Sequence, residues 1–174
     1  MGGGEVEIRP SSVADTDAYL ELLRRLDAET RFLLWEPGER TITAAQVRAA
    51  VDDRDPTAVA HLVAVAGDQM VGFLVAHRGP VRRLRHRADF TMAVVDSHRG
   101  RGVGRELLRA VEAWAVDVGV ERLELTVMAD NERAIALYES CGYEHEGTKR
   151  AAIRVDGRPV DERMMAKWLA LGSA

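Results

Sequence analysis

The hydrophobic positions in the first third of the chain follow two periods, each typical of one kind of element. Apolar and charged residues alternate over residues 5–9, which predicts a short first strand. Thr43 is a capping type of residue and begins a predicted helix that ends before the Asp55-Pro56 pair. Between these segments another helix is predicted, because apolar positions recur at helical spacing: Ala14, Ala18, Leu22 and Leu26.

The rest of the chain keeps switching between the strand period and the helix period. Two β-rich runs, 57–66 and 69–77, flank a glycine turn and predict a hairpin. An apolar strand over 88–95 leads through a glycine-rich loop into a strongly amphipathic helix over 103–118. The remaining runs predict a strand, a helix and a closing hairpin around Asp156-Gly157: 123–127, 131–140, 143–155 and 160–169.

The predicted element order is β-α-α-β-β-β-α-β-α-β-β, which indicates an α/β fold with helices flanking one mixed sheet. Several strands precede the first strand–helix–strand unit, so a purely parallel, doubly wound sheet is not expected. No repeat or low-complexity linker divides the sequence. We therefore expect a single domain over residues 1–174, with residues 1–4 as a flexible, glycine-rich tail.

The composition of the 174 residues agrees with a globular domain. Hydrophobic residues make up 47% and charged residues 30%, which is enough apolar material for one core. The net charge of −4 disfavours a general nucleic-acid-binding protein. Cys141 is the one cysteine, and no apolar run reaches the roughly 18 residues of a membrane span. We expect a cytoplasmic protein with no nucleic-acid or membrane partner.

The segment from Arg99 to Arg105 carries the clearest chemical signal. It reads Arg-Gly-Arg-Gly-Val-Gly-Arg and joins an apolar strand to the start of a helix. A helix N-terminus offers unpaired N–H groups, glycines let a ligand approach the backbone, and arginines add charge. These properties predict a phosphate or pyrophosphate site. The Walker A pattern does not match, because no Lys-Ser/Thr pair follows the glycines. The dinucleotide fingerprint does not match either: its last glycine would fall on Arg105 if it began at Gly100, and on Leu107 if it began at Gly102.

Two motifs resemble signatures of the GNAT superfamily of N-acetyltransferases. Arg99-x-x-Gly102-x-Gly104 is similar to the family's acetyl-CoA loop, Gln/Arg-x-x-Gly-x-Gly/Ala, and also lies between a strand and a helix. Downstream, the segment from Asn131 to Tyr143 resembles the family's Asn-x-x-Ala-x-x-x-Tyr-x-x-x-Gly-Phe/Tyr motif. The resemblance runs from about residue 5 to the C-terminus and is sharpest from about residue 88. It implies a GNAT-like, mostly antiparallel central sheet.

The resemblance also implies an enzyme, an acetyl-CoA-dependent N-acetyltransferase acting on a primary amine of a small molecule. The amine would attack the thioester directly in a ternary complex, with acetyl-CoA as co-substrate and without a metal. Tyr138 matches the motif tyrosine that protonates the departing thiolate, and a packing role is the alternative. The residues implied to bind acetyl-CoA are Met92, Val94, Val95, Arg99, Gly100, Arg101, Gly102, Val103, Gly104, Arg105 and Asn131.

Two further functions stay open at this point. An acetyltransferase for a protein N-terminus or a lysine would need a groove for a peptide. A non-catalytic acyl-CoA-binding module would have no use for Tyr138 as an acid. The general base is unassigned: histone-acetylating relatives carry a glutamate at the position of Ala88, and strand alternation points Asp89 to the other face. The remaining candidates for the base are Glu29, Glu36, His86 and His98.

Three other segments give weaker expectations. The loop over 29–38, with Phe32 and Trp35, stands where the family builds its acceptor pocket. The arginines between 82 and 87 indicate a solvated loop, with a phosphate-facing or acidic-substrate patch as the alternative, and Cys141 is interpreted as a packing residue. A homodimer is expected from the surplus of apolar residues near the C-terminus: Met164, Met165, Trp168 and Leu169.

Overall fold

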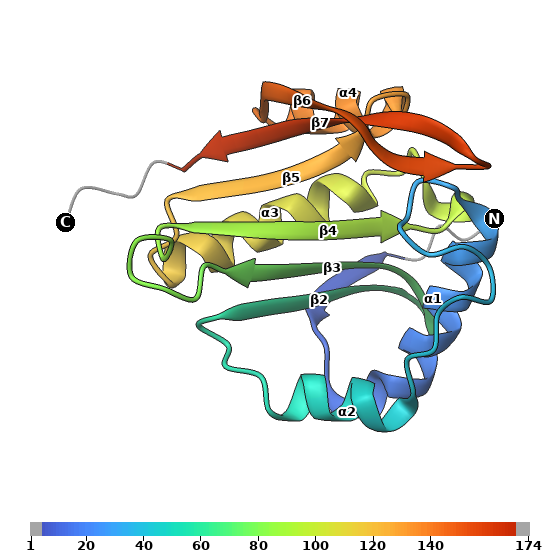
Figure 1. The fold of residues 1–174 in the computed structure, drawn as a ribbon. Helices are drawn as coiled ribbons and strands as arrows, with labels where there is room; N and C mark the ends of the chain where they lie inside the picture. Colours follow the sequence, from blue (N-terminus) through green and yellow to red (C-terminus); the bar gives the residue numbers. More distant parts are fainter. Residues whose placement is uncertain (1–4, 170–174) are drawn as a thin grey trace.

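The fold of residues 5–169, described here from a computed structural model, is built on one sheet of seven strands (Figure 1). The strand order is β1-β2-β3-β4-β5-β7-β6, and every neighbouring pair is antiparallel except β4 with β5. The strands are β1 (Val6–Pro10), β2 (Val59–Ala66), β3 (Gln69–Arg78), β4 (Arg87–Val94), β5 (Arg122–Met128), β6 (Glu144–Val155) and β7 (Arg158–Trp168).

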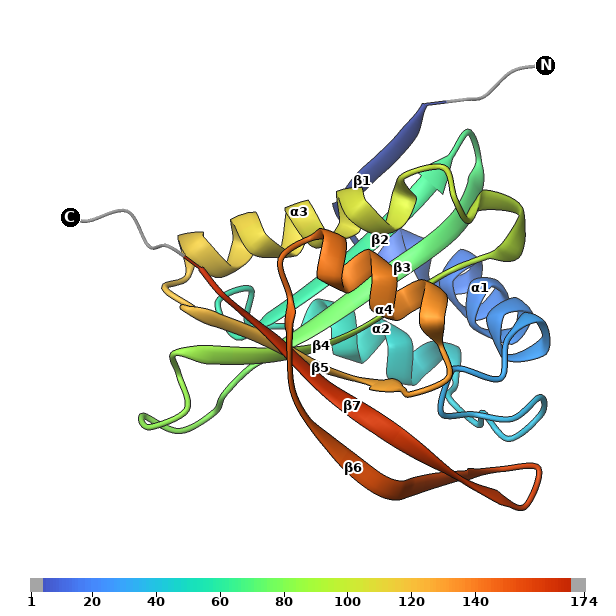
Figure 2. The same ribbon diagram turned by 90° about the horizontal axis from the view of Figure 1, so that it is seen from above.

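The helices cover both faces of the sheet. The helix α3 packs across β1 to β5 on one face with α4 beside it, whereas α1 and α2 lie on the other face (Figures 1 and 2). The helices are α1 (Thr16–Glu29), α2 (Ala44–Asp52), α3 (Val103–Asp117) and α4 (Glu132–Ser140). The predicted element order and the mixed, mostly antiparallel sheet are confirmed. Two short 3-10 turns, Val13–Asp15 and Asp96–His98, are additional to the predicted elements.

The buried face of α1 agrees with the predicted one only in part. Leu22 and Leu26 are buried as predicted, together with Tyr19, Leu20 and Leu23, whereas Ala14 and Ala18 are exposed. Ala14 belongs to the 3-10 turn before the helix, which has three residues per turn and so changes the face. Ala18 lies inside the α-helix, where each step of four residues back from Leu26 turns about 40° around the axis and away from the buried face.

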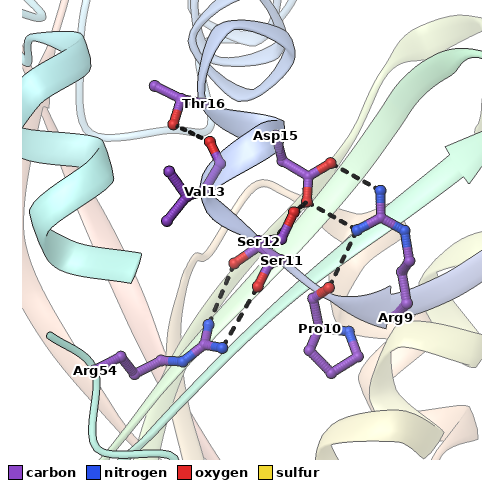
Figure 3. Close-up of polar contacts among 8 residues, drawn as sticks. All are labelled: Arg9, Pro10, Ser11, Ser12, Val13, Asp15, Thr16 and Arg54. Carbon is purple, nitrogen blue, oxygen red and sulfur yellow. Dashed lines mark hydrogen bonds and ion pairs between the residues drawn. The ribbon is translucent and has the colours of Figure 1, made fainter. Parts of the chain in front are cut away.

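The 3-10 turn is fixed to the end of β1 by a cluster of polar contacts (Figure 3). Both terminal nitrogens of Arg9 donate to the carboxylate of Asp15 at 2.8 Å, and the Ser12 backbone N–H donates to the same carboxylate at 2.7 Å. Arg54, beyond the end of α2, donates to the Ser11 hydroxyl at 3.2 Å. The Arg9 bond is the main cause that lowers the pKa of Asp15 well below its usual value. This cluster ties β1, α1 and the end of α2 together.

The loop between β3 and β4 agrees with the solvated interpretation of its arginines. Arg82, Arg83 and Arg85 are exposed. Arg87 is the exception, because it begins β4 and its guanidinium forms an ion pair with Glu124 of β5.

The partly buried ring of His61 on β2 makes the stability of the fold depend on pH. Its Nδ1 atom is buried without a hydrogen-bond partner among the described residues, and its ring lies 4.7 Å from that of Tyr19. Burial is the main cause that lowers the pKa of His61 from 6.5 to about 4. The unfolded chain therefore binds more protons than the folded one between these values, and stability falls as the pH drops from about 6.5 towards 4.

Between pH 8 and pH 4.5 the wild-type protein loses unfolding free energy. We expect His61→Phe to reduce this loss by about 2 to 3 kcal/mol, measured by denaturant titration at the two pH values. His145→Phe is the matched control, since His145 is exposed on β6, at the other edge of the sheet. An equal pH slope in wild type and His61→Phe would contradict the assignment.

Candidate active site

Among the strands of residues 5–169, one neighbouring pair is parallel, and this pair opens into a gap. β4 and β5 are paired over three positions alone, Arg87 with Arg122, Ala88 with Leu123 and Asp89 with Glu124. Beyond Asp89 the strands diverge toward their C-terminal ends, as Figure 1 shows. The edge of β4 that faces β5 is therefore unpaired from Phe90 to Val94.

An aromatic cluster begins where the pairing stops. The ring of Phe90 lies 6.2 Å from that of Tyr138 on α4 and 5.7 Å from that of Tyr143, and the two tyrosine rings are 5.9 Å apart. Tyr138 is buried, and burial alone raises the pKa of its phenol above the ordinary value. The phenol is therefore protonated at neutral pH and can donate a proton.

The backbone of β4 offers free groups toward the gap. The Val95 N–H donates to Val71 on β3 at 2.9 Å, and the carbonyl of Val95 accepts from the His98 N–H at 3.0 Å. Successive residues of a strand turn their backbone groups to opposite edges, so those of Met92 and Val94 face the gap. The Val94 carbonyl accepts a bond from Arg99 Nε at 2.8 Å, in agreement with this direction. Three residues at or directly after the end of β4 are predicted to contact acetyl-CoA. The backbone groups of Met92 and Val94 point into the gap, whereas the backbone N–H and carbonyl of Val95 are already hydrogen-bonded within the fold.

The glycine-rich loop forms the start of α3. Gly100 and Gly102 have φ of +72° and +88°, and Gly102 is the N-cap residue, with no side chain bonded to the helix end. A Cβ atom added at Gly102 would meet nothing within 4 Å. The first N–H groups of the helix, including that of Val103, have no intrahelical partner. The loop can therefore hold an anion against the helix N-terminus, as the sequence predicts.

Gly104 has a different role from the other two glycines. A Cβ atom there would lie 2.8 Å from Leu137 Cδ2 on α4 and 3.4 Å from Met92 Cε on β4. The glycine is therefore needed for the close approach of α3, α4 and β4, and not only for contact with a ligand. This contact also brings the start of α3 next to the helix that carries Tyr138.

The three arginines of the loop are placed differently. Arg99 is folded back onto the Val94 carbonyl and forms an ion pair with Asp96. Arg101 is exposed. Arg105 bonds to the end of α4, donating to the Ser140 hydroxyl at 2.8 Å and approaching Cys141 Sγ at 3.4 Å. Arg101 is thus the arginine with its charge free at the loop, and Cys141 lies in a packing contact between two helices.

Asn131 caps α4 as predicted, since its Oδ1 accepts from the Ala134 N–H at 3.3 Å. The side-chain NH2 group makes no hydrogen bond within residues 5–169, so it stays available to a ligand. The cap and a contact with acetyl-CoA are therefore compatible.

The candidates for the general base differ in how they are held. Glu29 accepts from Arg25 Nε at 2.6 Å and from the Asp96 N–H at 2.8 Å. Burial acts to raise the pKa of Glu29, but these bonds outweigh it and the pKa is lowered, which makes the carboxylate a weak base. Ala88 is buried, and Asp89 is exposed on the opposite face of β4, as strand alternation predicts. The other three candidates, Glu36, His86 and His98, lie on loops or in the 3-10 turn after β4.

A cavity of about 570 Å³ lies near the open end of the gap. Its lining residues come from the loop after α1, the loop after β5 and the tip of the β6–β7 hairpin: Arg31, Asp130, Val155, Asp156, Arg158, Pro159 and Val160. Phe32 supports this wall, because the Arg31 guanidinium lies 4.6 Å from its ring centroid, whereas Trp35 packs on Arg40. Sequence reasoning identified the loop but missed the cavity residues, since only the fold brings these three segments together.

The family of the chain follows from comparison with known proteins. The family model described as the acetyltransferase (GNAT) family matches residues 18–143. The chain belongs to the GNAT family. As a member of this family it is an acetyl-CoA-dependent N-acetyltransferase.

Curated relatives of this GNAT chain act on different acceptors. It is 36% identical over 118 residues to an L-amino acid N-acetyltransferase of Escherichia coli, covering 65% of this chain and 70% of that protein. It is 38% identical over 96 residues to an N-alpha-acetyltransferase of Mycobacterium tuberculosis, covering 52% of this chain and 58% of that protein.

Among solved structures, a GNAT acetyltransferase of Streptococcus pneumoniae superposes with a TM-score of 0.90 at 23% identity, covering 95% of this chain and all of that one. An acetyltransferase of Salmonella typhimurium, solved with acetyl-CoA, superposes with a TM-score of 0.84 at 21% identity, covering 98% of both chains. At these identities the likeness shows a common fold.

Within residues 5–169 there is no group of three or more His, Cys, Asp or Glu side chains that could hold a metal ion. None of the helices in that part of the chain is long and apolar enough to cross a membrane.

We expect Gly102→Glu to weaken acetyl-CoA binding roughly tenfold to a hundredfold, measured by calorimetry, because it puts a carboxylate over the helix N-terminus. Gly38→Glu is the matched control, since Gly38 has φ of +87° and equally open surroundings but lies in the loop after α1. Unchanged affinity in a folded Gly102→Glu protein would remove the loop as the acetyl-CoA site.

Proposed function

We propose that this GNAT protein transfers the acetyl group of acetyl-CoA to the primary amine of a small molecule in a ternary complex. The observation that carries the proposal is the position of Tyr138, next to the first unpaired residue of β4. The start of α3 reaches the same gap through the contact of Gly104 with Met92 and Leu137. A proton donor, free backbone groups and an anion-binding helix end therefore meet along one opening.

The proposed acetyl-CoA contacts follow from which groups the fold leaves free. The helix N–H groups from Val103 onward would bind the pyrophosphate at the glycine loop, over Gly100 and Gly102. Arg101 would add positive charge there. Arg99 would also reach the ligand once its hydrogen bond to the Val94 carbonyl is broken. The gap-facing backbone groups of two residues, Met92 and Val94, would pair with the pantetheine arm, and Asn131 would contact it. Val95, Gly104 and Arg105 are better explained by packing and hydrogen bonds within the fold.

The chemistry needs a proton donor for the leaving thiolate. Acetyl-CoA supplies an electrophilic thioester carbonyl and a thiolate leaving group. The neutral amine of the acceptor attacks that carbonyl, a C–N bond forms, the C–S bond breaks, and the nitrogen loses one proton. Tyr138 donates its phenolic proton to the thiolate, and the phenolate then regains a proton from solvent, which burial favours because it raises the pKa of the phenol. We assign the proton lost by the nitrogen to solvent, because Glu29 is held by Arg25 and the Asp96 N–H.

The size of the cavity supports a small-molecule acceptor. Loops from three parts of the chain line a volume of about 570 Å³ that is partly open to solvent and has room for an amino acid or a small polyamine. Curated relatives include enzymes for L-amino acids and for spermidine as well as an N-alpha-acetyltransferase, so the protein-acetylating alternative is kept as the second candidate.

A screen of acceptors tests the proposal. Release of free CoA from acetyl-CoA is measured with amino acids, spermidine, aminoglycosides and peptides with a free N-terminus. Turnover with one or more small amines is the expected result. Turnover with peptides alone would favour the second candidate, and binding of acetyl-CoA without turnover on any amine would favour a non-catalytic module.

A cytoplasmic homodimer stays part of the proposal. Trp168 at the end of β7 is 62% exposed and available to a partner, whereas Met165 is 1% exposed and already buried within the chain. Light scattering at micromolar concentration that gives the monomer mass would contradict the dimer.

We expect Tyr138→Phe to lower the turnover number by roughly 10²- to 10⁴-fold while leaving the affinity for acetyl-CoA nearly unchanged, because the ring stays and the proton donor is removed. Tyr143→Phe is the matched control: the buried Tyr143 hydroxyl has no hydrogen-bond partner within residues 5–169, and its ring belongs to the same aromatic cluster. Full turnover of Tyr138→Phe, with chemistry shown to be rate-limiting, would make Tyr138 a packing residue.

A further inference from the structure

An ion pair joins two sides of the cavity at the open end of the gap. Arg31, in the loop after α1, donates from Nη2 to Asp130 Oδ2 at 2.5 Å. Asp130 follows β5 and directly precedes Asn131, the cap of α4. The pair therefore connects the acceptor side of the molecule to the helix that carries Tyr138.

Arg31 is held in place and is still able to bind a second anion. Its guanidinium lies over the Phe32 ring at 4.6 Å, and its side chain is 46% exposed. Only one of its nitrogens is bonded to Asp130, and the others make no hydrogen bond to the part of the chain that the structure describes. A planar guanidinium with a free edge matches a carboxylate, which it can bind through two parallel N–H···O bonds.

The hairpin tip lines the cavity with both apolar and charged residues. Val155, Pro159 and Val160 come from this tip together with Asp156 and Arg158. A ligand that fills the cavity therefore meets the Arg31 guanidinium from the loop after α1, and a mixed surface from the hairpin.

We propose that Arg31 binds the carboxylate of the acceptor, so that an amino acid is preferred over the simple amine that lacks only the carboxylate. This inference rests on the proposed function, because it assigns the acceptor of the same site. The carboxylate occupies the free edge of the Arg31 guanidinium, Asp130 keeps that guanidinium oriented, and the side chain contacts the hairpin tip.

Arg158 is the other arginine of the cavity and the competing anchor. It lies at the exposed tip of the hairpin, and no hydrogen bond or ion pair to the described residues orients it. Arg31 is oriented by both Asp130 and Phe32, and a preoriented group loses less conformational entropy on binding.

The test compares acceptors that differ only in the carboxylate. Steady-state kinetics are measured with phenylalanine and phenethylamine, and with leucine and isoamylamine, in the full-length protein with saturating acetyl-CoA. We expect wild type to prefer the amino acid of each pair. Arg31→Gln should lower kcat/KM for the amino acids about tenfold to a hundredfold, mainly through KM, and leave the values for the two amines nearly unchanged. Arg31→Lys should restore part of the loss.

Two control variants and an independent binding measurement separate the outcomes. Arg24→Gln changes an exposed arginine on α1 outside the cavity and should have no effect. Arg158→Gln changes the competing anchor, and loss of the carboxylate preference there but not in Arg31→Gln would overturn the assignment. Equal kcat/KM within each pair, or a preference for spermidine, would overturn the inference while leaving the acetyltransferase function intact. Failure to bind acetyl-CoA in calorimetry would overturn both.

Discussion

The short contact between β4 and β5 is the constraint on which the rest of the molecule depends. Three paired positions hold these parallel strands together. A network of ion pairs reinforces that end of the sheet. The Glu124 carboxylate accepts from Arg87 on β4 and from Arg122 at 3.0 Å, and Arg122 also donates to Glu146 on β6. The ladder then stops at Phe90, where the rings of Tyr138 and Tyr143 fill the space on the helical face. The sheet is one hydrogen-bonded layer at one end and two diverging halves at the other, and the opening provides the backbone edge for a ligand.

Close packing of two helices over this gap brings the chemical groups together. Gly104 lets α3 approach α4 and β4, so the helix end that can hold a pyrophosphate lies beside the helix that carries Tyr138. The loop between β5 and α4 serves both sides of the site, because Asn131 caps α4 and Asp130 reaches Arg31 across the cavity. A change in that loop would therefore be expected to affect the donor side and the acceptor side together.

The proposed acceptor cavity is built separately from the proposed acetyl-CoA site. The cavity walls come from a loop after α1, a loop after β5 and a hairpin tip, whereas the glycine-rich loop belongs to a single continuous strand–loop–helix segment. Structural relatives named for different activities share the fold, among them a ribosomal-protein-alanine N-acetyltransferase of Brucella melitensis and a phosphinothricin acetyltransferase of Sinorhizobium meliloti, each with a TM-score of 0.82. The fold therefore does not decide the acceptor, which depends on the loops placed around a common core.

Sequence patterns alone predicted the element order, the position of the glycine-rich loop before α3 and the family. These features are local: alternation, helical spacing, caps and two motifs are read from residues near each other in the chain, as for Asn131 and Tyr138. The same patterns wrongly placed Ala14 and Ala18 on the buried face of α1. Ala14 lies in a 3-10 turn that depends on the contact of Asp15 with Arg9, and Ala18 lies on the exposed side of the α-helix. Only the tertiary structure separated Gly104, which is needed for helix packing, from Gly102, which lies open to a ligand. It alone brought Arg31 to Asp130, 99 positions away along the chain. Contacts between distant segments depend on how the layers of the fold pack, and a local sequence pattern does not specify which distant segments come together.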